Sequence, residues 1–137
     1  MKKMIFPVIV LLLLFTWQLS LASDHMDMPK GEWLCYSEVI CSFYGDMTID
    51  SNTIKFKETG PIHYRIIRST ENQTTIELDR APDCGRFIII GPYDKNENFL
   101  DFSVYKTKED ALAVTDTDIK NNIHPKCCTW GLYDKGR

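Results

Sequence analysis

Residues 47–66 read MTIDSNTIKFKETGPIHYRI, and apolar and polar side chains alternate through most of this stretch. The alternating apolar positions on either side of the Ser51-Asn52 pair are Met47, Ile49, Ile54 and Phe56. Alternation with period two marks strands that bury one face, and a short polar segment between two such runs marks a hairpin turn. Gly60-Pro61 then breaks the pattern before it resumes. The stretch therefore predicts three consecutive antiparallel strands.

The same period continues toward both ends of the chain. Further strands are expected at residues 32–37, 62–66, 76–78, 100–105 and 129–133, and the fully apolar run 87–90 is expected to form a central strand. Short strands at regular spacing predict a mostly β domain over residues 31–137, an antiparallel meander forming a small closed barrel or a tight sandwich. The side chains expected to face inward are Trp33, Ile49, Ile54, Phe56, Tyr64, Ile66, Ile76, Leu78, Phe87, Ile89, Leu100, Phe102 and Val104.

Two other segments complete the expected domain. Thr107 followed three residues later by Asp110 resembles a capping box and predicts one short helix near residues 108–114. Residues 115–126 are polar and read as irregular structure. Residues 23–30 show no periodicity and are expected to form a flexible N-terminal arm.

Residues 1–22 have the three-part layout of a secretory signal peptide. Lys2 and Lys3 precede an apolar run over residues 5–15, and Ser20 and Ala22 place small residues at the −3 and −1 positions of a cleavage site. The run is shorter than the roughly 20 residues that span a bilayer as a helix. We therefore expect cleavage after Ala22, no membrane anchor afterwards, and an exported chain that is periplasmic or secreted.

The charge of the chain limits its partners. The whole chain carries −3 at pH 7, and removal of Lys2 and Lys3 with the signal peptide leaves 14 basic against 19 acidic side chains, or −5. An acidic chain without a lysine or arginine cluster argues against binding to nucleic acid or to an anionic membrane surface. A protein partner of such a chain is expected to be basic.

All five cysteines follow the expected cleavage point: Cys35, Cys41, Cys84, Cys127 and Cys128. In an oxidising compartment they predict two disulfides and one remaining thiol. Cys127 and Cys128 are not expected to bond to each other, because adjacent cysteines meet the required geometry poorly. Barrel closure favours Cys35 with one of this pair and Cys84 with the other, leaving Cys41, and a Cys35–Cys41 bond is the alternative. No C-x-x-C pair is present, so zinc is not expected here.

Gly31-Glu32-Trp33 at the head of the first predicted strand resembles the G-x-W signature of lipocalins and related small β-barrels. In that family the tryptophan closes one end of the barrel and packs near a late arginine. Arg137 is the only arginine after Arg86. The resemblance implies a barrel and, as one function, the carriage of a small apolar ligand.

The sequence offers no recognisable catalytic motif. It contains no G-x-S-x-G, no H-E-x-x-H, no P-loop and no dinucleotide fingerprint, and His25, His63 and His124 have no partners at catalytic spacing. His63 is expected to face solvent. We therefore expect a non-enzymatic protein that binds another protein, in the manner of an inhibitor or immunity protein, with a lipocalin-like carrier as the alternative. Exposed aromatic residues expected at a protein interface are Tyr44, Tyr93 and Tyr133.

Two local motifs suggest modification or metal binding. A chain beginning Ser23-Asp24-His25 offers an amine, two amides and an imidazole, a four-nitrogen set that suits square-planar Cu(II). This set resembles the amino-terminal copper and nickel motif of other exported proteins, and copper binding by the arm is a further alternative function. Asn72-Gln73-Thr74 is an N-glycosylation acceptor if the source is eukaryotic.

Overall fold

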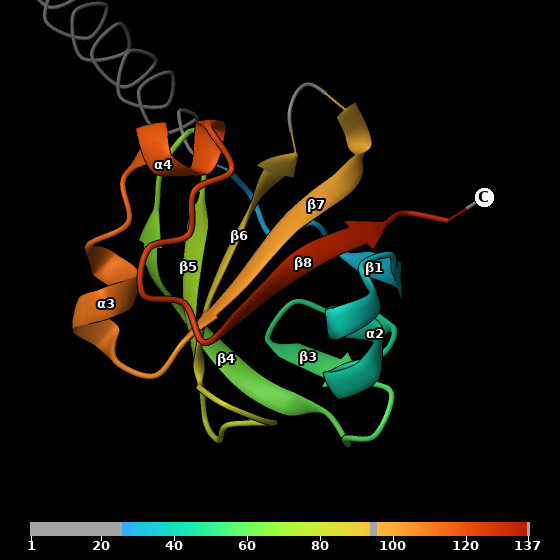
Figure 1. The fold of residues 1–137 in the computed structure, drawn as a ribbon. Coiled ribbons are helices and arrows are strands. Elements are labelled where there is room, and N and C mark those ends of the chain that lie inside the picture. The colour runs from blue at the N-terminus through green and yellow to red at the C-terminus, as the bar shows by residue number, and fades with distance from the viewer. Residues whose placement is uncertain (1–25, 94–95, 137) are drawn as a thin grey trace, which may run out of the picture.

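The computed structural model describes residues 26–93 and 96–136. Within them, eight antiparallel strands follow one another in sequence order around a closed barrel (Figure 1). The strands are β1 Gly31–Cys35, β2 Met47–Ile49, β3 Thr53–Phe56, β4 Ile62–Ser69, β5 Thr74–Leu78, β6 Phe87–Tyr93, β7 Asn96–Tyr105 and β8 Thr129–Asp134. The helices are α2 Glu38–Phe43, α3 Lys108–Leu112 and α4 Asp116–Lys120. The predicted antiparallel β fold is confirmed, in its barrel form.

The hairpin predicted from residues 47–56 is present as β2 and β3. Ile49 pairs with Ile54 across the turn, and the amide of Asp50 donates to the carbonyl of Thr53 at 2.9 Å. The four alternating apolar side chains of this hairpin are all buried, so the register follows from the burial of one face. His63, on the next strand, is exposed as expected.

The barrel closes where the first strand meets the last. Leu34 pairs with Asp134 and Cys35 with Tyr133, which places the two ends of the domain side by side. Strands β6 and β7 pair over most of their length, and β7 continues the sheet directly into β8. Closure removes the exposed strand edges that would otherwise promote association between chains.

Two disulfides brace the domain, and their pairing differs in part from the prediction. Cys84 bonds Cys128, as one half of the favoured scheme required, and Cys127 does not bond its neighbour. The expected bond from Cys35 to the adjacent pair is wrong. Helix α2 turns the chain back on β1, so Cys41 reaches Cys35 and Cys127 keeps its thiol instead of Cys41. The disulfides point to an oxidising, non-cytoplasmic environment.

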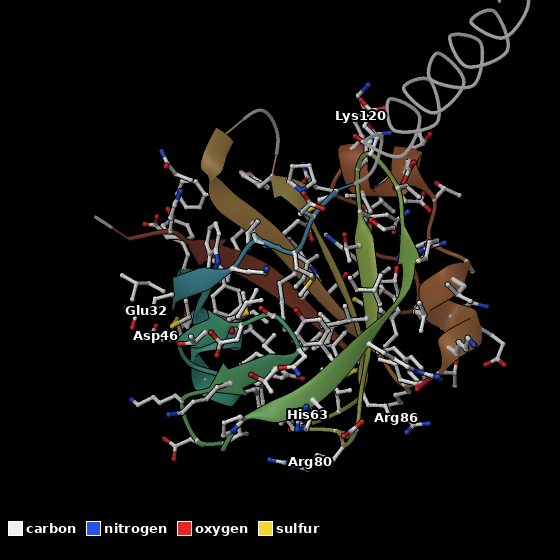
Figure 2. All side chains as sticks on the ribbon, turned by 180° about the vertical axis from the view of Figure 1, so that it is seen from behind. Glu32, Asp46, His63, Arg80, Arg86 and Lys120 are labelled. Atoms are coloured by element: carbon white, nitrogen blue, oxygen red, sulfur yellow. A yellow bond between two sulfur atoms is a disulfide. The ribbon has the colours of Figure 1, made fainter. Side chains whose placement is uncertain are left out.

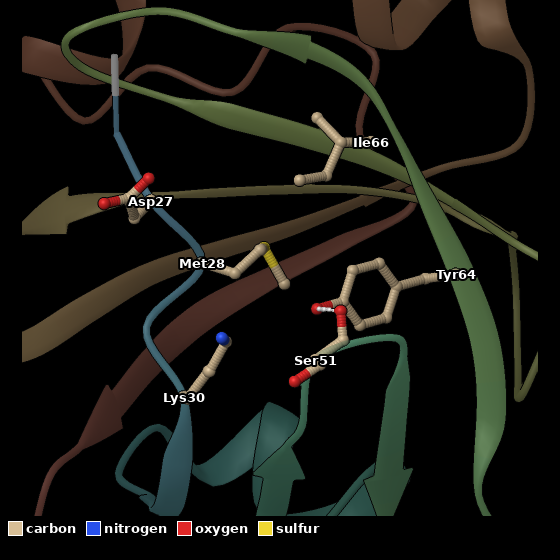
Figure 3. A pocket seen from close by; sticks show the side chains of 6 residues that line it. All are labelled: Asp27, Met28, Lys30, Ser51, Tyr64 and Ile66. Carbon is tan, nitrogen blue, oxygen red and sulfur yellow. Dashed lines mark hydrogen bonds between the residues drawn. The ribbon is translucent and has the colours of Figure 1, made fainter. Parts of the chain in front are cut away.

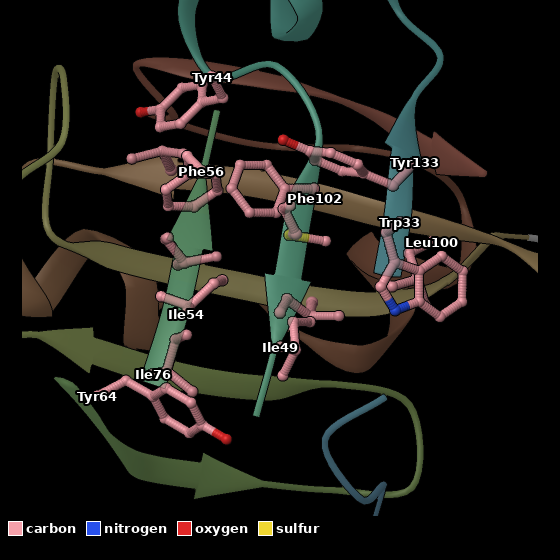
Figure 4. Packing of buried hydrophobic residues seen from close by; sticks show 14 of the residues in the cluster. Trp33, Tyr44, Ile49, Ile54, Phe56, Tyr64, Ile76, Leu100, Phe102 and Tyr133 are labelled. Carbon is pink, nitrogen blue, oxygen red and sulfur yellow. The ribbon is translucent and has the colours of Figure 1, made fainter. Parts of the chain in front are cut away.

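Large side chains fill the barrel interior. Phe102 contacts the rings of Tyr44, Phe56 and Tyr133 edge-to-face, with centroid separations of 5.6, 6.0 and 5.1 Å (Figure 4). Isoleucines from β2, β3 and β5 occupy the middle with Trp33 and Leu100 to one side, and Tyr64 lies at the other end. Edge-to-face aromatic packing stabilises a core beyond the area that it buries.

Helix α2 closes one end of the barrel. Ile40 is fully buried in the core and packs against Gly131 of β8, where an added Cβ would overlap the Ile40 side chain. Gly131 therefore provides the space that lets the helix approach the strand. The helix was not predicted, since residues 32–37 alternate as a strand does and Ser37 makes no capping bond with its side chain.

Replacing Gly131 with alanine is expected to lower the free energy of unfolding by about 1–3 kcal/mol. The new methyl group must displace Ile40, whose position the surrounding core fixes. Urea unfolding of the two proteins measures the difference. Gly60→Ala is the matched control, because nothing lies within 4 Å of a Cβ at Gly60. Equal loss of stability in both variants would refute the role given to Gly131.

A second apolar layer lies outside the barrel wall. Phe87, Ile89 and Tyr105 point outward from β6 and β7 and are covered by buried residues of the α3–α4 region. The prediction that Phe87 and Ile89 face inward is therefore wrong. All four residues of the apolar run 87–90 are buried, Ile88 and Ile90 inside the barrel and the other two beneath the helices. A run without polar residues does not indicate which side chains face the barrel interior and which face outward.

Capping residues set where the two helices of this layer, α3 and α4, begin. Thr107 accepts a hydrogen bond from the amide of Asp110 at the start of α3, as predicted. Thr115 and Asp118 form a reciprocal capping box at the start of α4, which lies in a segment expected to be irregular. Arg68 of β4 donates to carbonyls at the end of α3 at 2.8 and 3.1 Å. Its guanidinium thereby holds that helix against the barrel.

Asp116 fixes α4 to the β4–β5 turn. Its carboxylate accepts hydrogen bonds from Thr70 at 2.7 Å and Gln73 at 2.8 Å, and Asn72 also bonds to it. Burial alone would raise the pKa of Asp116, but these three bonds and the charge of Arg68 hold it below the ordinary 3.8. The acceptor asparagine of the glycosylation motif thus has a structural role in this turn.

Folding stability is expected to fall in acid partly through Asp116. A lowered pKa in the folded state stabilises the protein above the carboxyl's ordinary pKa, and this contribution is lost as the pH falls through the lower folded value. Unfolding midpoints of wild type and Asp116→Asn should therefore converge between neutral pH and about pH 2. A pH-independent difference would contradict this, and Glu71→Gln in the same turn serves as the control.

A strap formed by residues 26–30 crosses the end of the barrel opposite α2. The amide of Met26 donates to the Thr70 carbonyl at 2.6 Å, and the Thr74 hydroxyl donates to the Met26 carbonyl at 2.7 Å. The indole of Trp33 donates to the Pro29 carbonyl at 2.8 Å. This part of the chain is thus fixed at both ends, which differs from the flexible arm expected from composition. Residues 23–25 lie outside the described residues.

Candidate functional site

The outer surface of the barrel is covered on one side and uncovered on the other. The layer of α3 and α4 covers β6 and part of β7, whereas the outer faces of β8 and β1 carry no helix of that layer (Figure 1). On the uncovered side, apolar side chains project outward from three adjacent strands. We call these residues the bare face: Leu34, Tyr36, Phe99, Trp130 and Leu132.

Strand register makes the bare face continuous. Asp134 of β8 pairs with Leu34 on one side and Phe99 on the other, and the amide of Tyr36 donates to the Leu132 carbonyl at 3.0 Å. Exposed fractions are 47% for Leu34, 62% for Tyr36 and 45% for Trp130. Contiguous exposed apolar groups of this kind are uncommon on monomers and mark interaction sites.

Aromatic contacts hold the side chains of the bare face in place. The rings of Tyr36 and Phe99 meet edge-to-face with their centroids 5.1 Å apart, and the ring of Tyr93 also meets Phe99 edge-to-face, at 6.2 Å. A side chain that is already ordered loses little conformational entropy when a partner binds. The face is therefore preorganised as well as apolar.

Trp130 is positioned by a buried polar pair. The His124 ring stacks on the Trp130 indole with a centroid separation of 4.5 Å and an interplanar angle of 18°. Nε2 of His124 lies 2.7 and 2.8 Å from the two carboxylate oxygens of Asp101, and the side chains of this pair are only 3% and 1% exposed. The pair thus fixes the inner face of Trp130 and leaves the outer face open to solvent.

Carboxylates border the bare face. Glu32 shares the outward side of β1 with Leu34, and Asp134 lies between Leu34 and Phe99. Asp46 accepts a hydrogen bond from the Cys35 amide at 2.9 Å, and Glu32 and Asp46 lie at the same edge of the barrel (Figure 2). The basic residues labelled in that view, Arg80, Arg86 and Lys120, lie away from this edge.

Two of the three tyrosines predicted at an interface are inside the barrel. Tyr44 and Tyr133 are 2% and 0% exposed, and burial raises the pKa of both phenols well above their ordinary value. The prediction for these two is therefore wrong, because their aromatic rings complete the core at the α2 end. Tyr93 is partly exposed and supports the bare face. The exposed apolar side chains of the barrel wall come instead from outward positions of β1 and β8, where Leu34 and Trp130 lie.

Cys127 is the free cysteine among the described residues, and it is partly buried. It packs against the outer apolar cluster, and burial together with the charge of Asp101 raises the pKa of its thiol. A raised pKa lowers the fraction of reactive thiolate at neutral pH, and the structure gives no hydrogen bond between this thiol and His124. Cys127, His124 and Asp101 therefore resemble a catalytic triad in composition but not in geometry.

Metal binding finds no additional support in the described part of the chain. There, no group of three histidine, cysteine or acidic side chains is placed to hold an ion. The copper ligands predicted at Ser23, Asp24 and His25 lie outside the described residues, so that hypothesis stays a prediction.

Among residues 26–93 and 96–136, no helix has the length and apolar content needed to cross a membrane. Comparison with protein-family models, curated proteins and solved structures gives no match to this chain.

Proposed function

We propose that this chain is an exported, non-catalytic binding protein that binds another protein through its bare face. The observation that carries the proposal is the exposure of three large apolar side chains, Leu34, Tyr36 and Trp130, on the side of the barrel formed by β1 and β8. Tyrosine and tryptophan dominate the energetics of protein interfaces, since they bury a large area with few rotatable bonds. Their positions here are already set by Phe99 and His124.

Charge indicates which kind of partner the face fits. Glu32, Asp46 and Asp134 place carboxylates around the apolar centre, and the expected exported chain carries −5. A basic protein with an apolar residue at its contact centre would complement both features. Electrostatic attraction of this type raises the association rate and weakens as salt increases. Inhibition of a basic secreted or periplasmic enzyme is the function that we consider first.

The filled interior is our reason for placing protein binding ahead of carriage of an apolar ligand inside the barrel. The volume that a carrier would use is occupied by rings of Tyr44, Phe56, Phe102 and Tyr133 at one end. Small eight-stranded barrels either fill with side chains or hold one ligand, and the core residues here are large.

A capture experiment tests the proposal. The purified chain without residues 1–22 is immobilised and exposed to the periplasmic or extracellular fraction of the organism that makes it. We expect one basic protein to be retained by wild type and by a His63→Ser control on the far wall, and to be lost with Tyr36→Ser combined with Trp130→Ser. Retention should fall as salt rises. Equal retention by the double variant, or retention that ignores salt, would contradict the proposal.

A further inference from the structure

A pocket of about 540 Å³ opens beside the strap, at the end of the barrel opposite α2. It is lined by residues of the strap, the β2–β3 turn and β4: Asp27, Met28, Lys30, Ser51, Tyr64 and Ile66 (Figure 3). Sites for small molecules are typically about 300–1,000 Å³ in volume. The pocket is separate from the bare face, which lies on the outer wall of β7, β8 and β1.

One side of the pocket is apolar. Ile66 pairs with the fully buried Ile76 and lies on the inward side of β4, yet it is 51% exposed. The prediction that Ile66 belongs to the buried core is therefore wrong, because the residue stands at the rim of the barrel where no other side chain covers it. Met28 and the ring of Tyr64 continue the apolar surface beneath it.

The Tyr64 hydroxyl already donates its proton within the protein and does not donate to a ligand. It donates to the carbonyls of Asp50 and Ser51, at 2.7 and 3.1 Å. These bonds fix the ring with its face toward the pocket and tie β4 to the β2–β3 turn. The ring therefore offers apolar surface in a defined position.

The polar side chains make the two ends of the pocket chemically different. Lys30 reaches from the strap toward the pocket at the end where Ser51 lies, whereas Asp27 and Ile66 lie toward the other end (Figure 3). In the described part of the chain, the ammonium group of Lys30 forms no ion pair. A cation beside a hydroxyl suits a carboxylate.

We propose that this pocket binds a small amphipathic anion, a monocarboxylate with a short apolar chain. The carboxylate lies between the Lys30 ammonium and the Ser51 hydroxyl, and the apolar chain covers Ile66, Met28 and the ring of Tyr64. Binding removes the exposed surface of Ile66 from water and pairs Lys30, which together supply the driving force.

Titration with octanoate and with octylammonium, two probes of equal chain length and opposite charge, tests the inference. We expect saturable one-to-one binding of octanoate by calorimetry, with methyl shifts of Met28 and Ile66 in NMR spectra, and much weaker binding of octylammonium. Lys30→Gln should weaken octanoate at least about tenfold through loss of a charge-assisted bond. Ile66→Ser should weaken it too, because the apolar contact is lost.

Lys106→Gln is the matched control, since this exposed lysine follows β7 at the other end of the barrel. It should bind octanoate as wild type does, and so should Tyr36→Ser, which separates this site from the bare face. Absence of saturable octanoate binding, equal affinity for octylammonium, or an unchanged affinity in Lys30→Gln would overturn the proposal.

Discussion

Replacing Cys84 and Cys128 together with serine is expected to lower the free energy of unfolding by about 4 kcal/mol. The disulfide closes a loop with a sequence separation of 44 residues, so its loss greatly increases the conformational freedom of the unfolded chain. It also ties the loop before β6 to the segment that leads into β8. Denaturant unfolding of the double variant under non-reducing conditions measures the effect.

The second disulfide supplies the control. Cys35 and Cys41 are separated by 6 residues, so the same chain-entropy relation gives only about 2 kcal/mol for its removal. We expect the Cys84–Cys128 variant to lose clearly more stability than the Cys35–Cys41 variant. The reverse order would mean that the helix α2 closure, and not the long loop, limits the stability of the barrel.

Replacing His124 with alanine is expected to lower the free energy of unfolding by about 3 kcal/mol or more. The variant leaves Asp101, 1% exposed, without the imidazole that satisfies both of its oxygens. A buried carboxylate without a partner is strongly unfavourable. Because His124 also supports the indole of Trp130, the variant should bind a partner of the bare face more weakly than Asp101→Asn does.

An exposed ion pair serves as the control that shows whether burial of Asp101 causes the loss of stability in His124→Ala. Arg65 and Glu77 approach within 2.7 Å, but the Arg65 side chain is 68% exposed. Removal of Arg65 should therefore change stability by less than about 1 kcal/mol. If His124→Ala lowers stability no more than Arg65→Ala does, the Asp101–His124 pair does not have the structural role given to it here.

Period-two alternation predicted most of the barrel because it depends on burial of one strand face. It placed the β2–β3 hairpin and the strands that carry Ile76 and Phe102 correctly. It failed where both faces are apolar. Phe87 and Ile89 point outward because α3 and α4 cover that wall, and nothing local in a four-residue apolar run distinguishes this arrangement from an inward one.

The candidate site was harder to predict than the fold. Tyr44 and Tyr133 stand beside turn residues and were expected at the surface, but the core at the α2 end needs their rings. The outward row of β1 and β8 depends on closure, since only the pairing of these strands brings Leu34 beside Phe99. Helix α2, which brings Cys41 to Cys35, has no side-chain N-cap, so the sequence carried no capping signal from which to predict it.

Site-specific photo-cross-linking tests protein binding by the bare face most directly. A p-benzoylphenylalanine at position 36 reports on the centre of the face, and the same residue at position 63 reports on an exposed position of the opposite wall. In the organism that makes the chain, irradiation should join position 36 to one basic polypeptide and leave position 63 unlinked. No adduct at position 36, or the same adducts at both positions, would contradict the account.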